Sequence, residues 1–274
     1  MRTAAPTEAS DTVADQDTEA FYLPSGEGVF QSTRHTAGPW TAEAQHLGPP
    51  SALLMRALEQ VPADRDTQLA RVTIEILGPV PIAELTVRAT LVRPGRSVEL
   101  LNAEMSANGR VVATASAWRI TTTDSTPVEA GQADPLPGWE GIEPTGRPDG
   151  WGPGYIDVME WRPLHGGLHV PGPATAWVRQ VIPLVDGEKP TGLQRLFTVA
   201  DSGNGLSNRL NPSQWWFINT DLTVHIQREP VGEWIGLDAN TAIGPTGIGT
   251  ASSVLHDAEG QVAIGAQALM VRPR

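Results

Sequence analysis

A carboxylate and an amide in the second half of the sequence stand at positions where local rules disfavour them. Asp201 closes an apolar helical stripe, beside the negative end of the helix dipole, where a carboxylate is unfavourable. Gln267 lies between two alanines in an apolar run, where an amide without a partner would be costly if buried. A carboxylate can act as a general base, and an amide can both donate and accept hydrogen bonds. Residues that break a local rule in this way are candidates for function.

Both residues also have ordinary structural interpretations. Asp201 could cap the glycine turn that follows it through its own side chain, and Gln267 could lie on the exposed face of a strand. The run Asp201-Ser202-Gly203 matches the signature of aspartic proteases, but those enzymes need two copies, and the sequence holds one. The residue pattern by itself leaves capping and catalysis open for Asp201.

A predicted helix over Thr191–Ser202 places Asp201. Four apolar residues follow i, i+3, i+4, i+7 spacing, the pattern of a helix that packs on a core: Leu193, Leu196, Phe197 and Ala200. Pro190 suits the start of the helix, and the glycines at 203 and 205 predict its end.

The first half of the chain predicts one helix and a series of strands. A helix is expected at Pro50–Gln60, after an irregular segment that contains His46. Asn108-Gly109 predicts a hairpin, because both turn positions require a positive φ. The strands are expected at Gly28–Thr33, Leu69–Leu77, Glu84–Arg93, Ser97–Ala107 and Arg110–Thr122.

The second half repeats this order. After a linker at 123–154 that is rich in Thr, Pro, Gly and acids, strands are expected on both sides of the Thr191–Ser202 helix. They cover Tyr155–Leu164, Thr175–Leu184, Ser213–Gln227, Glu233–Ala242, Thr250–His256 and Gln261–Arg272. Val72–Ile76 corresponds to Leu222–Ile226, 150 residues later, and the two hairpin turns correspond at nearly the same offset. A repeat of this length indicates a duplicated domain.

A helix followed by a twisted antiparallel meander suggests a sheet wrapped around a helix. One such unit leaves sheet edges open, and two units can pair their edge strands. The predicted fold class is therefore α+β, a double hotdog in which two helix-plus-antiparallel-sheet repeats of one chain form a continuous sheet. The predicted parts are a disordered tail at 1–20, a first hotdog repeat at 21–122, the linker at 123–154 and a second hotdog repeat at 155–274.

Four segments resemble the acyl-CoA thioesterase II family, over roughly residues 20–272. Leu47–Leu54 resembles the Phe-Gly-Gly segment that leads into the family's first helix. Val199-Ala200-Asp201 resembles the helix end that carries the family's catalytic Asp, and Val262–Gln267 resembles the strand that ends in its catalytic Gln. In Phe217–Asp221 the family has a catalytic Thr two residues before an Asp. Here Asn219 holds that place, with Thr220 adjacent.

The resemblance implies hydrolysis of acyl-CoA thioesters to fatty acid and CoA, without a covalent intermediate, a metal or a cofactor. It implies that Asp201 activates water, that Gln267 and Asn219 or Thr220 hold that water, and that the acyl chain lies in an apolar tunnel. A helix N-terminus near Gly48 or Gly192 is expected to stabilise the oxyanion. The CoA diphosphate is expected near basic residues, with Arg195, Arg209 and Arg228 as unranked candidates.

Two other functions stay open on the same residues. A non-catalytic protein that binds acyl groups or acyl-CoA is consistent with Asn219 in place of Thr. An acyl-thioester dehydratase would use a His base near the start of the first helix, and His46 lies close to that place. Only the second half carries the polar trio, because Leu69 and Ser116 correspond to Asn219 and Gln267. One site per chain is therefore expected, with Glu59 as a solvated surface residue.

Composition and motifs exclude several other classes. The 274 residues contain no cysteine, which excludes disulfides and thiolate chemistry, and the net charge of −12 argues against nucleic acid and anionic membranes as partners. No apolar run is long enough to span a bilayer, and we expect a cytoplasmic protein of fatty acid metabolism, with its oligomeric state open. His165 and His169 have metal-like spacing but lie in a glycine loop, Gly244–Thr250 lacks the Lys of a phosphate loop, and no Gly-x-Ser-x-Gly occurs. The nine tryptophans, Trp215-Trp216 among them, are expected to pack in the core and at interfaces.

Overall fold

The computed structural model describes residues 19–274. The tail predicted at 1–20 therefore lies almost entirely outside the described residues. At the described end of that segment, Ala20 and Phe21 are fully buried, and the Thr33 hydroxyl donates to the Ala20 carbonyl at 2.7 Å.

The described residues form one sheet of thirteen strands and three α-helices. The helices are α1 (Gly48–Glu59), α2 (Gly192–Ala200) and α3 (Gly203–Leu206), and single turns of 3-10 helix occur at Arg34–Thr36, Thr126–Val128 and Tyr155–Val158. The strands are β1 (Tyr22–Gly26), β2 (Val29–Ser32), β3 (Thr67–Ile76), β4 (Glu84–Arg93), β5 (Val98–Ala107), β6 (Arg110–Thr121), β7 (Met159–Gly167), β8 (Val170–Gln180), β9 (Trp215–Asn219), β10 (Asp221–Ile226), β11 (Ile235–Ile243), β12 (Ile248–Asp257) and β13 (Gly260–Pro273).

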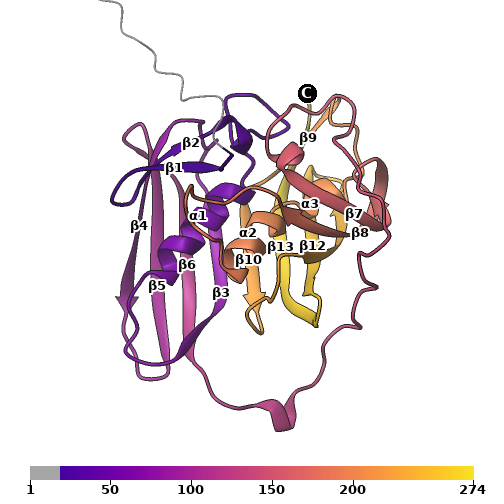
Figure 1. The fold of residues 1–274 in the computed structure, drawn as a ribbon. Coiled ribbons are helices and arrows are strands. Elements are labelled where there is room, and N and C mark those ends of the chain that lie inside the picture. Colours follow the sequence, from indigo (N-terminus) through magenta and orange to yellow (C-terminus); the bar gives the residue numbers. More distant parts are fainter. Residues whose placement is uncertain (1–18) are drawn as a thin grey trace, which may run out of the picture.

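The strand order shows two copies of one unit joined at the middle. It runs β1-β2-β4-β5-β6-β3-β10-β13-β12-β11-β8-β7, with β9 paired to β13 beside this path. All of the pairings between these strands are antiparallel. The first half of the chain forms one side of the sheet and the second half the other (Figure 1).

The seam between the halves is the pairing of β3 with β10. Thr73 lies opposite Thr223, its own counterpart in the repeat, and the Thr223 hydroxyl donates to the Thr73 hydroxyl at 3.1 Å. On either side, Val72 pairs with Val224 and Ile74 with Leu222. The repeat is therefore related by a local two-fold axis through these threonines, the geometry of a symmetric dimer interface within one chain.

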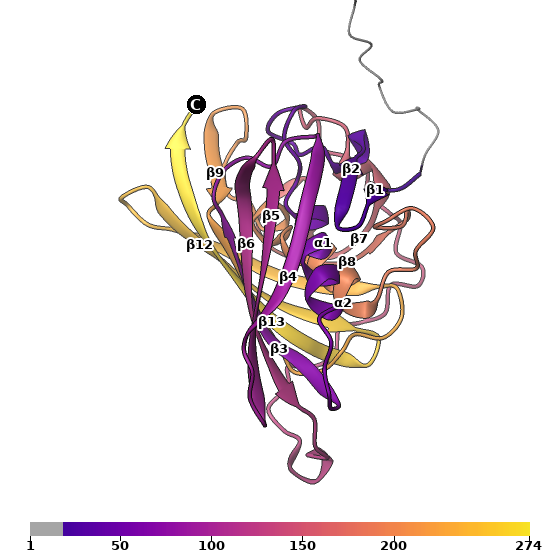
Figure 2. The same ribbon diagram turned by 90° about the vertical axis from the view of Figure 1, so that its left-hand side faces the viewer.

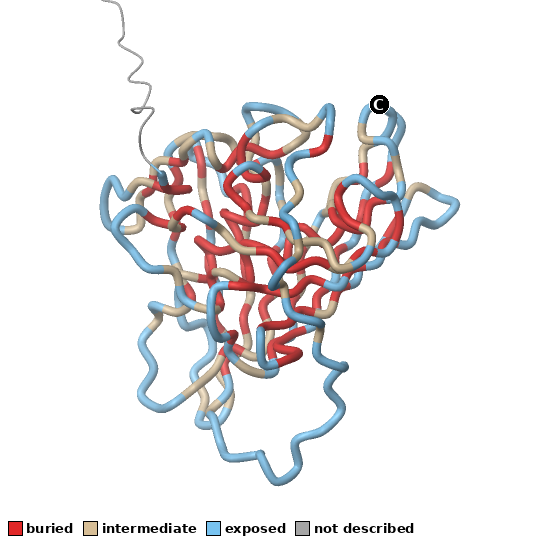
Figure 3. Tube along the Cα trace, turned by 45° about the vertical axis from the view of Figure 1, so that its right-hand side comes forward, coloured by how far each residue is buried: buried red, intermediate tan, exposed pale blue. Residues whose placement is uncertain are grey.

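Helices α1 and α2 lie side by side on the same face of the curved sheet (Figures 1 and 2). They run in opposite directions, because the end of α1 contacts the start of α2 and the end of α2 contacts the start of α1. Gly48 permits this close approach, since a Cβ there would collide with the Thr198 carbonyl oxygen of α2. Buried residues are concentrated between the helices and the sheet (Figure 3).

The structure differs from the predicted elements at several places. Strand β1 was not predicted, β8 lies about five residues earlier than the strand predicted at Thr175–Leu184, and His165 lies in β7 rather than in a loop. The glycines at 203 and 205 do not end the helical region, because Asp201-Ser202 make a turn and α3 follows at Gly203–Leu206. The strand predicted at Ser213–Gln227 is two strands, separated at Thr220. The predicted strand Tyr155–Leu164 begins as a 3-10 helix at Tyr155–Val158, because Tyr155 turns inward to contact α2.

The segment predicted as a linker, 123–154, packs on the second repeat over its later part. The Ala133 N–H donates to the Gln261 side chain at 2.7 Å, and the ring of Trp139 stacks on that of Trp234 at 5.4 Å. Thr145 forms an isolated bridge with Trp161. Residues 123–132 are exposed and form the loop at the bottom of Figure 1.

Candidate active site

Asp201 lies between the end of α2 and the start of α1. It is the C-cap of α2 and is 3% exposed. Its Oδ2 lies 3.3 Å from Nδ1 of His46, and the carboxylate accepts a hydrogen bond from the Leu47 backbone N–H. The positive end of the α1 dipole thus offsets the negative end of α2, where a carboxylate is disfavoured.

Asn219 and Gln267 both donate to the same oxygen of Asp201. Asn219 Nδ2 lies 2.8 Å from Oδ1, and Gln267 Nε2 lies 3.2 Å from Oδ1 and 3.0 Å from the Asp201 carbonyl oxygen. Gln267 is 3% exposed, and its Oε1 accepts from the Asn204 N–H of α3 at 3.1 Å. The two amides therefore fix the carboxylate itself, and Gly203 allows Gln267 to approach α3 closely.

Burial controls the protonation of Asp201. It raises the pKa of the carboxyl above that of a free aspartate, against the charge of His46 and the hydrogen bonds from Asn219, Leu47 and Gln267. Burial also lowers the pKa of the His46 imidazole, against the attraction of Asp201. Both shifts favour the uncharged forms, a protonated Asp201 carboxyl beside a neutral His46 imidazole.

The His46 Nδ1 atom has two partners that need it in different states. It accepts from the Gly48 N–H at 3.0 Å when it carries no proton, and it donates to Asp201 when it carries one. A proton that moves between His46 and Asp201 therefore also changes what the Gly48 N–H can bind.

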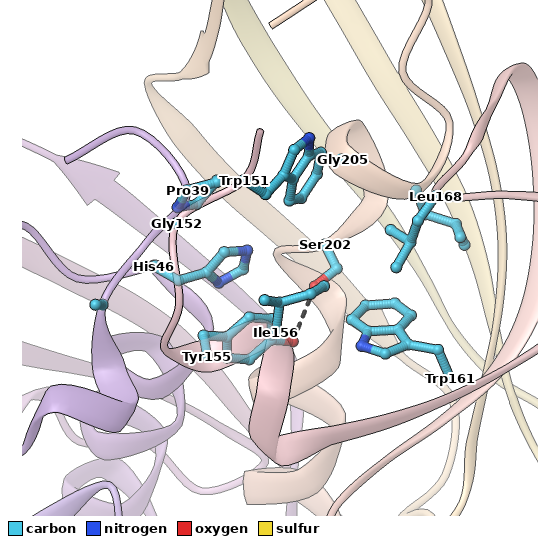
Figure 4. Close-up of a pocket in the computed structure, with 12 residues that line it drawn as sticks. Pro39, His46, Trp151, Gly152, Tyr155, Ile156, Trp161, Leu168, Ser202 and Gly205 are labelled. Carbon is cyan, nitrogen blue, oxygen red and sulfur yellow. Dashed lines mark hydrogen bonds between the residues drawn. The ribbon is translucent and has the colours of Figure 1, made fainter. Parts of the chain in front are cut away.

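Tyr155 fixes the plane of the His46 ring. The two rings stack at 3.9 Å with an angle of 7° between them (Figure 4). The Tyr155 hydroxyl donates to the Thr198 carbonyl at 2.9 Å and lies 2.9 Å from the Ser202 hydroxyl. Tyr155 is buried, and it connects the imidazole to the last turn of α2.

A pocket of about 500 Å³ opens at these residues. Asp201, His46 and Asn219 line it at one place, and apolar side chains from several elements line most of the rest. The larger apolar side chains of the lining are Trp40, Leu47, Ile76, Val80, Trp151, Trp216, Phe217, Ile218 and Met270. Its walls suit an elongated apolar ligand that reaches the carboxylate.

The structure brings some of the predicted site residues together and leaves others apart. Asp201, Gln267 and Asn219 are in contact, with Gly48 beside His46. Thr220 lines the pocket, but its side chain is exposed and donates weakly to the Ala268 carbonyl at 3.4 Å, away from the carboxylate. Gly192 begins α2, about 13 Å along the helix from Asp201, and packs against Pro230.

The three arginines proposed for the diphosphate are engaged elsewhere. Arg195 donates to the Pro190 carbonyl, Arg209 to the Thr241 carbonyl and Arg228 to the buried carboxylate of Asp257. None of the three lines the pocket that holds Asp201.

Glu59 is the counterpart of Asp201 at the other end of the helix pair. It accepts from Thr191 at 2.8 Å and from Gln194 at 2.7 Å at the start of α2, and it is half-buried. The prediction of a solvated surface residue was therefore wrong. Burial raises the pKa of Glu59, and the two hydrogen bonds oppose this shift.

Family comparison follows the same division into repeats. An acyl-CoA thioesterase N-terminal domain matches residues 36–120, and an acyl-CoA thioesterase C-terminal domain matches residues 135–271. The chain belongs to the acyl-CoA thioesterase family. It is a thioesterase, as the sequence resemblance predicts, and the family to which it belongs acts on acyl-CoA.

Solved structures confirm the predicted double-hotdog fold of the thioesterase. A hot dog fold protein from Alicyclobacillus acidocaldarius has a TM-score of 0.72 and 17% identity, covering 93% of this chain and 97% of that one. A protein assigned to thioesterase II from Thermobifida fusca has a TM-score of 0.71 and 17% identity, covering 93% and 96%. An acyl-CoA thioesterase II from Mycobacterium marinum has a TM-score of 0.61 and 15% identity, covering 90% and 92%.

No curated protein matches the chain. Within residues 19–274, no helix is both long enough and apolar enough to cross a membrane. The same residues contain no group of three or more His, Asp or Glu side chains placed to hold a metal ion.

Proposed function

We propose that the thioesterase hydrolyses acyl-CoA to free fatty acid and CoA with water activated by Asp201. The observation that carries the proposal is a buried carboxylate, fixed by two amides, at the wall of a largely apolar pocket. A carboxyl whose pKa lies above that of a free aspartate is a better proton acceptor than an exposed one.

The residues suggest a direct attack by water. Its oxygen bonds to the thioester carbonyl carbon while its proton passes to Asp201. The tetrahedral intermediate then collapses, the C–S bond breaks, and the sulfur of CoA receives the proton. Asn219 and Gln267 keep Oδ1 in place throughout, since both donate to it. No bond to the protein forms.

Gly48 is our candidate donor for the oxyanion. Pro49 and Pro50 follow it and lack an N–H, and the Ser51 N–H is bonded to the Leu47 carbonyl within α1. The Gly48 N–H binds unprotonated Nδ1 of His46. When Nδ1 holds a proton toward Asp201, this N–H is free for the carbonyl oxygen that gains charge.

The test is the Asp201→Asn variant, with Glu59→Gln as its matched control. Both substitutions remove a carboxylate that bonds the start of the partner helix and keep its shape. Release of CoA from dodecanoyl-CoA, measured as free thiol, should fall at least about a hundredfold in Asp201→Asn and stay unchanged in Glu59→Gln. The melting temperature of both should match or exceed that of the wild type, because each loses a buried charge. Full activity of Asp201→Asn would overturn the assignment.

A second candidate function is hydration and dehydration of acyl thioesters, favoured by the 3.3 Å contact of His46 with Asp201. With 3-hydroxyacyl-CoA as substrate, a dehydratase forms the conjugated enoyl thioester, which absorbs in the ultraviolet, and releases no thiol. His46→Gln should abolish that absorbance change if it occurs. Tight binding of acyl-CoA without either product, across a panel of chain lengths, would identify the non-catalytic binding protein instead.

A further inference from the structure

Two pockets meet at a common wall beside the site. The pocket that contains Asp201 shares Pro39, Trp40 and Trp151 with a second pocket of about 550 Å³, here called the side pocket. The rest of the side pocket is formed by residues 148–150, Leu168, His169, Pro171, Asn208, residues 210–213 and Arg274. A molecule that reacts at Asp201 and is too long for the Asp201 pocket can therefore extend into the adjoining side pocket.

The chemistry of the two pockets differs. Apolar side chains dominate the Asp201 pocket, such as Ile76, Phe217 and Met270. The side pocket carries polar groups, among them Asn208, Asn211 and His169. An acyl thioester has the same division, with a hydrocarbon on one side of the reacting carbonyl and an amide-rich arm ending in phosphates on the other. The Asp201 pocket suits the first part and the side pocket the second.

A cation lies on aromatic rings at the rim of the side pocket. The Arg274 guanidinium lies 3.8 Å from the centre of the Trp216 ring and 5.5 Å from that of Trp40. The Trp40 ring packs edge-on against buried Phe217 at 4.8 Å, and the two tryptophan rings lie 5.4 Å apart. The Arg274 N–H also donates to the Gln214 carbonyl at 2.9 Å, which fixes the backbone. Stacking on these rings holds the guanidinium while leaving its donors open.

Arg274 has no ion pair and no side-chain hydrogen bond within residues 19–274, unlike Arg195, Arg209 and Arg228. Its neighbour Arg272 donates to the Gly247 and Val271 carbonyls and does not line the side pocket. Asp149 is the acid among the described residues that line this pocket, and its charge opposes that of Arg274. A guanidinium with free donors on an aromatic platform suits phosphate oxygens and an adjacent base.

We propose that Arg274, stacked on Trp216 and Trp40, binds the phosphate-bearing nucleotide end of coenzyme A, with the pantetheine arm along the side pocket. The proposal deepens the proposed function, on which its placement of the thioester rests. It assigns recognition of the coenzyme to residues that do not touch the reacting carbonyl. The substrate of this site is then the coenzyme A ester rather than a thioester of a shorter thiol.

Binding of free CoA tests the subsite without any turnover. By isothermal titration calorimetry at low salt, Arg274→Gln should weaken CoA binding about tenfold, as expected for the loss of charged hydrogen bonds. Arg272→Gln, the matched control two residues earlier in the chain, should leave the dissociation constant unchanged. Asp149→Asn should tighten binding, because it removes a like charge for the phosphates. Equal affinity of wild type and Arg274→Gln, an equal loss in Arg272→Gln, or no binding of CoA by the wild type would overturn the proposal.

Kinetics then separate this subsite from the chemistry. With dodecanoyl-CoA, Arg274→Gln should raise KM about tenfold and leave kcat unchanged, and with S-dodecanoyl-pantetheine, which lacks the nucleotide, both constants should match the wild type. A similar loss on both substrates would contradict a role at the phosphates. If the protein hydrolyses neither substrate while CoA binding depends on Arg274, the proposed function fails and the subsite stands.

Discussion

At the scale of single residues, the site is a carboxylate at the end of one helix that is stabilised by groups at the start of the other. Asp201 ends α2 beside unfavourable partial charge, and the sequence identifies it as a candidate for that reason. The carboxylate is stabilised at this position by His46 and Leu47, about 150 residues earlier in the chain. No local pattern connects these segments, so the contact of His46 with Asp201 could not be predicted from spacing. Gln267 could be singled out because an amide in an apolar run needs a partner.

The contact between His46 and Asp201 predicts the pH dependence of the proposed hydrolysis. In the proposed mechanism Asp201 must be ionised to accept a proton from water, and its pKa is raised by burial. The acid limb of kcat/KM should therefore lie above the ordinary range of an aspartate, with activity rising as pH increases through it. His46 opposes the rise in this pKa, so His46→Gln should move the acid limb to still higher pH. Profiles of wild type and His46→Gln with one acyl-CoA check this, and coincident acid limbs would contradict it.

At the scale of elements, alternation and turn chemistry predict most strands closely. The range Glu84–Arg93 matches β4, and Asn108-Gly109 adopt the positive φ values of 51° and 74° that their turn requires. The break between β9 and β10 could not be predicted, because it comes from pairing. β9 pairs with Leu269–Pro273 of β13 and β10 with residues 263–266. Gly203 was misinterpreted for a similar reason, since it serves the approach of Gln267 and not a helix end.

The ion pair of Arg228 with the buried Asp257 predicts a substitution that should destabilise the second repeat. The Asp257 side chain is fully buried and accepts from Arg228 and from the Val231 and Glu259 N–H groups. Burial alone would raise the pKa of Asp257, but these hydrogen bonds outweigh it and hold the pKa below the usual value. Arg228→Met leaves a buried carboxylate without its charge partner and should lower the free energy of unfolding by about 3 kcal/mol.

Urea unfolding at neutral pH measures this loss. The control is Arg147→Met, which removes an exposed ion pair with Asp157 and should change stability by less than about 1 kcal/mol. Because the folded pKa of Asp257 is lowered, its stabilising contribution is present above the unfolded pKa and is lost as pH falls through the folded value. The difference between wild type and Arg228→Met should therefore shrink in acid. Equal effects of the two substitutions would contradict the argument.

At the scale of the whole molecule, the two repeats behave as the two halves of a dimer. The repeat offset of the sequence predicts the pairing of equivalent strands, and Thr73 lies opposite Thr223 in the sheet. What the repeat could not predict is how far the halves interlock. The Arg56 guanidinium of α1 binds Glu188 through two hydrogen bonds of 2.7 and 2.6 Å, and Glu59 binds the start of α2. The candidate active site takes His46 from one half and Asp201 from the other.

This interlocking predicts that the covalent connection between the repeats is dispensable once the chain has folded. Residues 123–132 are exposed, and the contacts with the second repeat begin at Ala133, so a protease site inserted at Gly131 leaves both units complete. After cleavage, the fragments should elute as one species, melt in one transition and keep the activity of the uncut protein, because the β3–β10 seam and the α1–α2 contact remain. The fragment 132–274 expressed alone should aggregate, since it exposes the edge of β10 and the buried face of α2. Cleaved fragments that separate on size exclusion without denaturant, or a cut protein that keeps its fold but loses its thioesterase activity, would show that the connection does more than join the repeats.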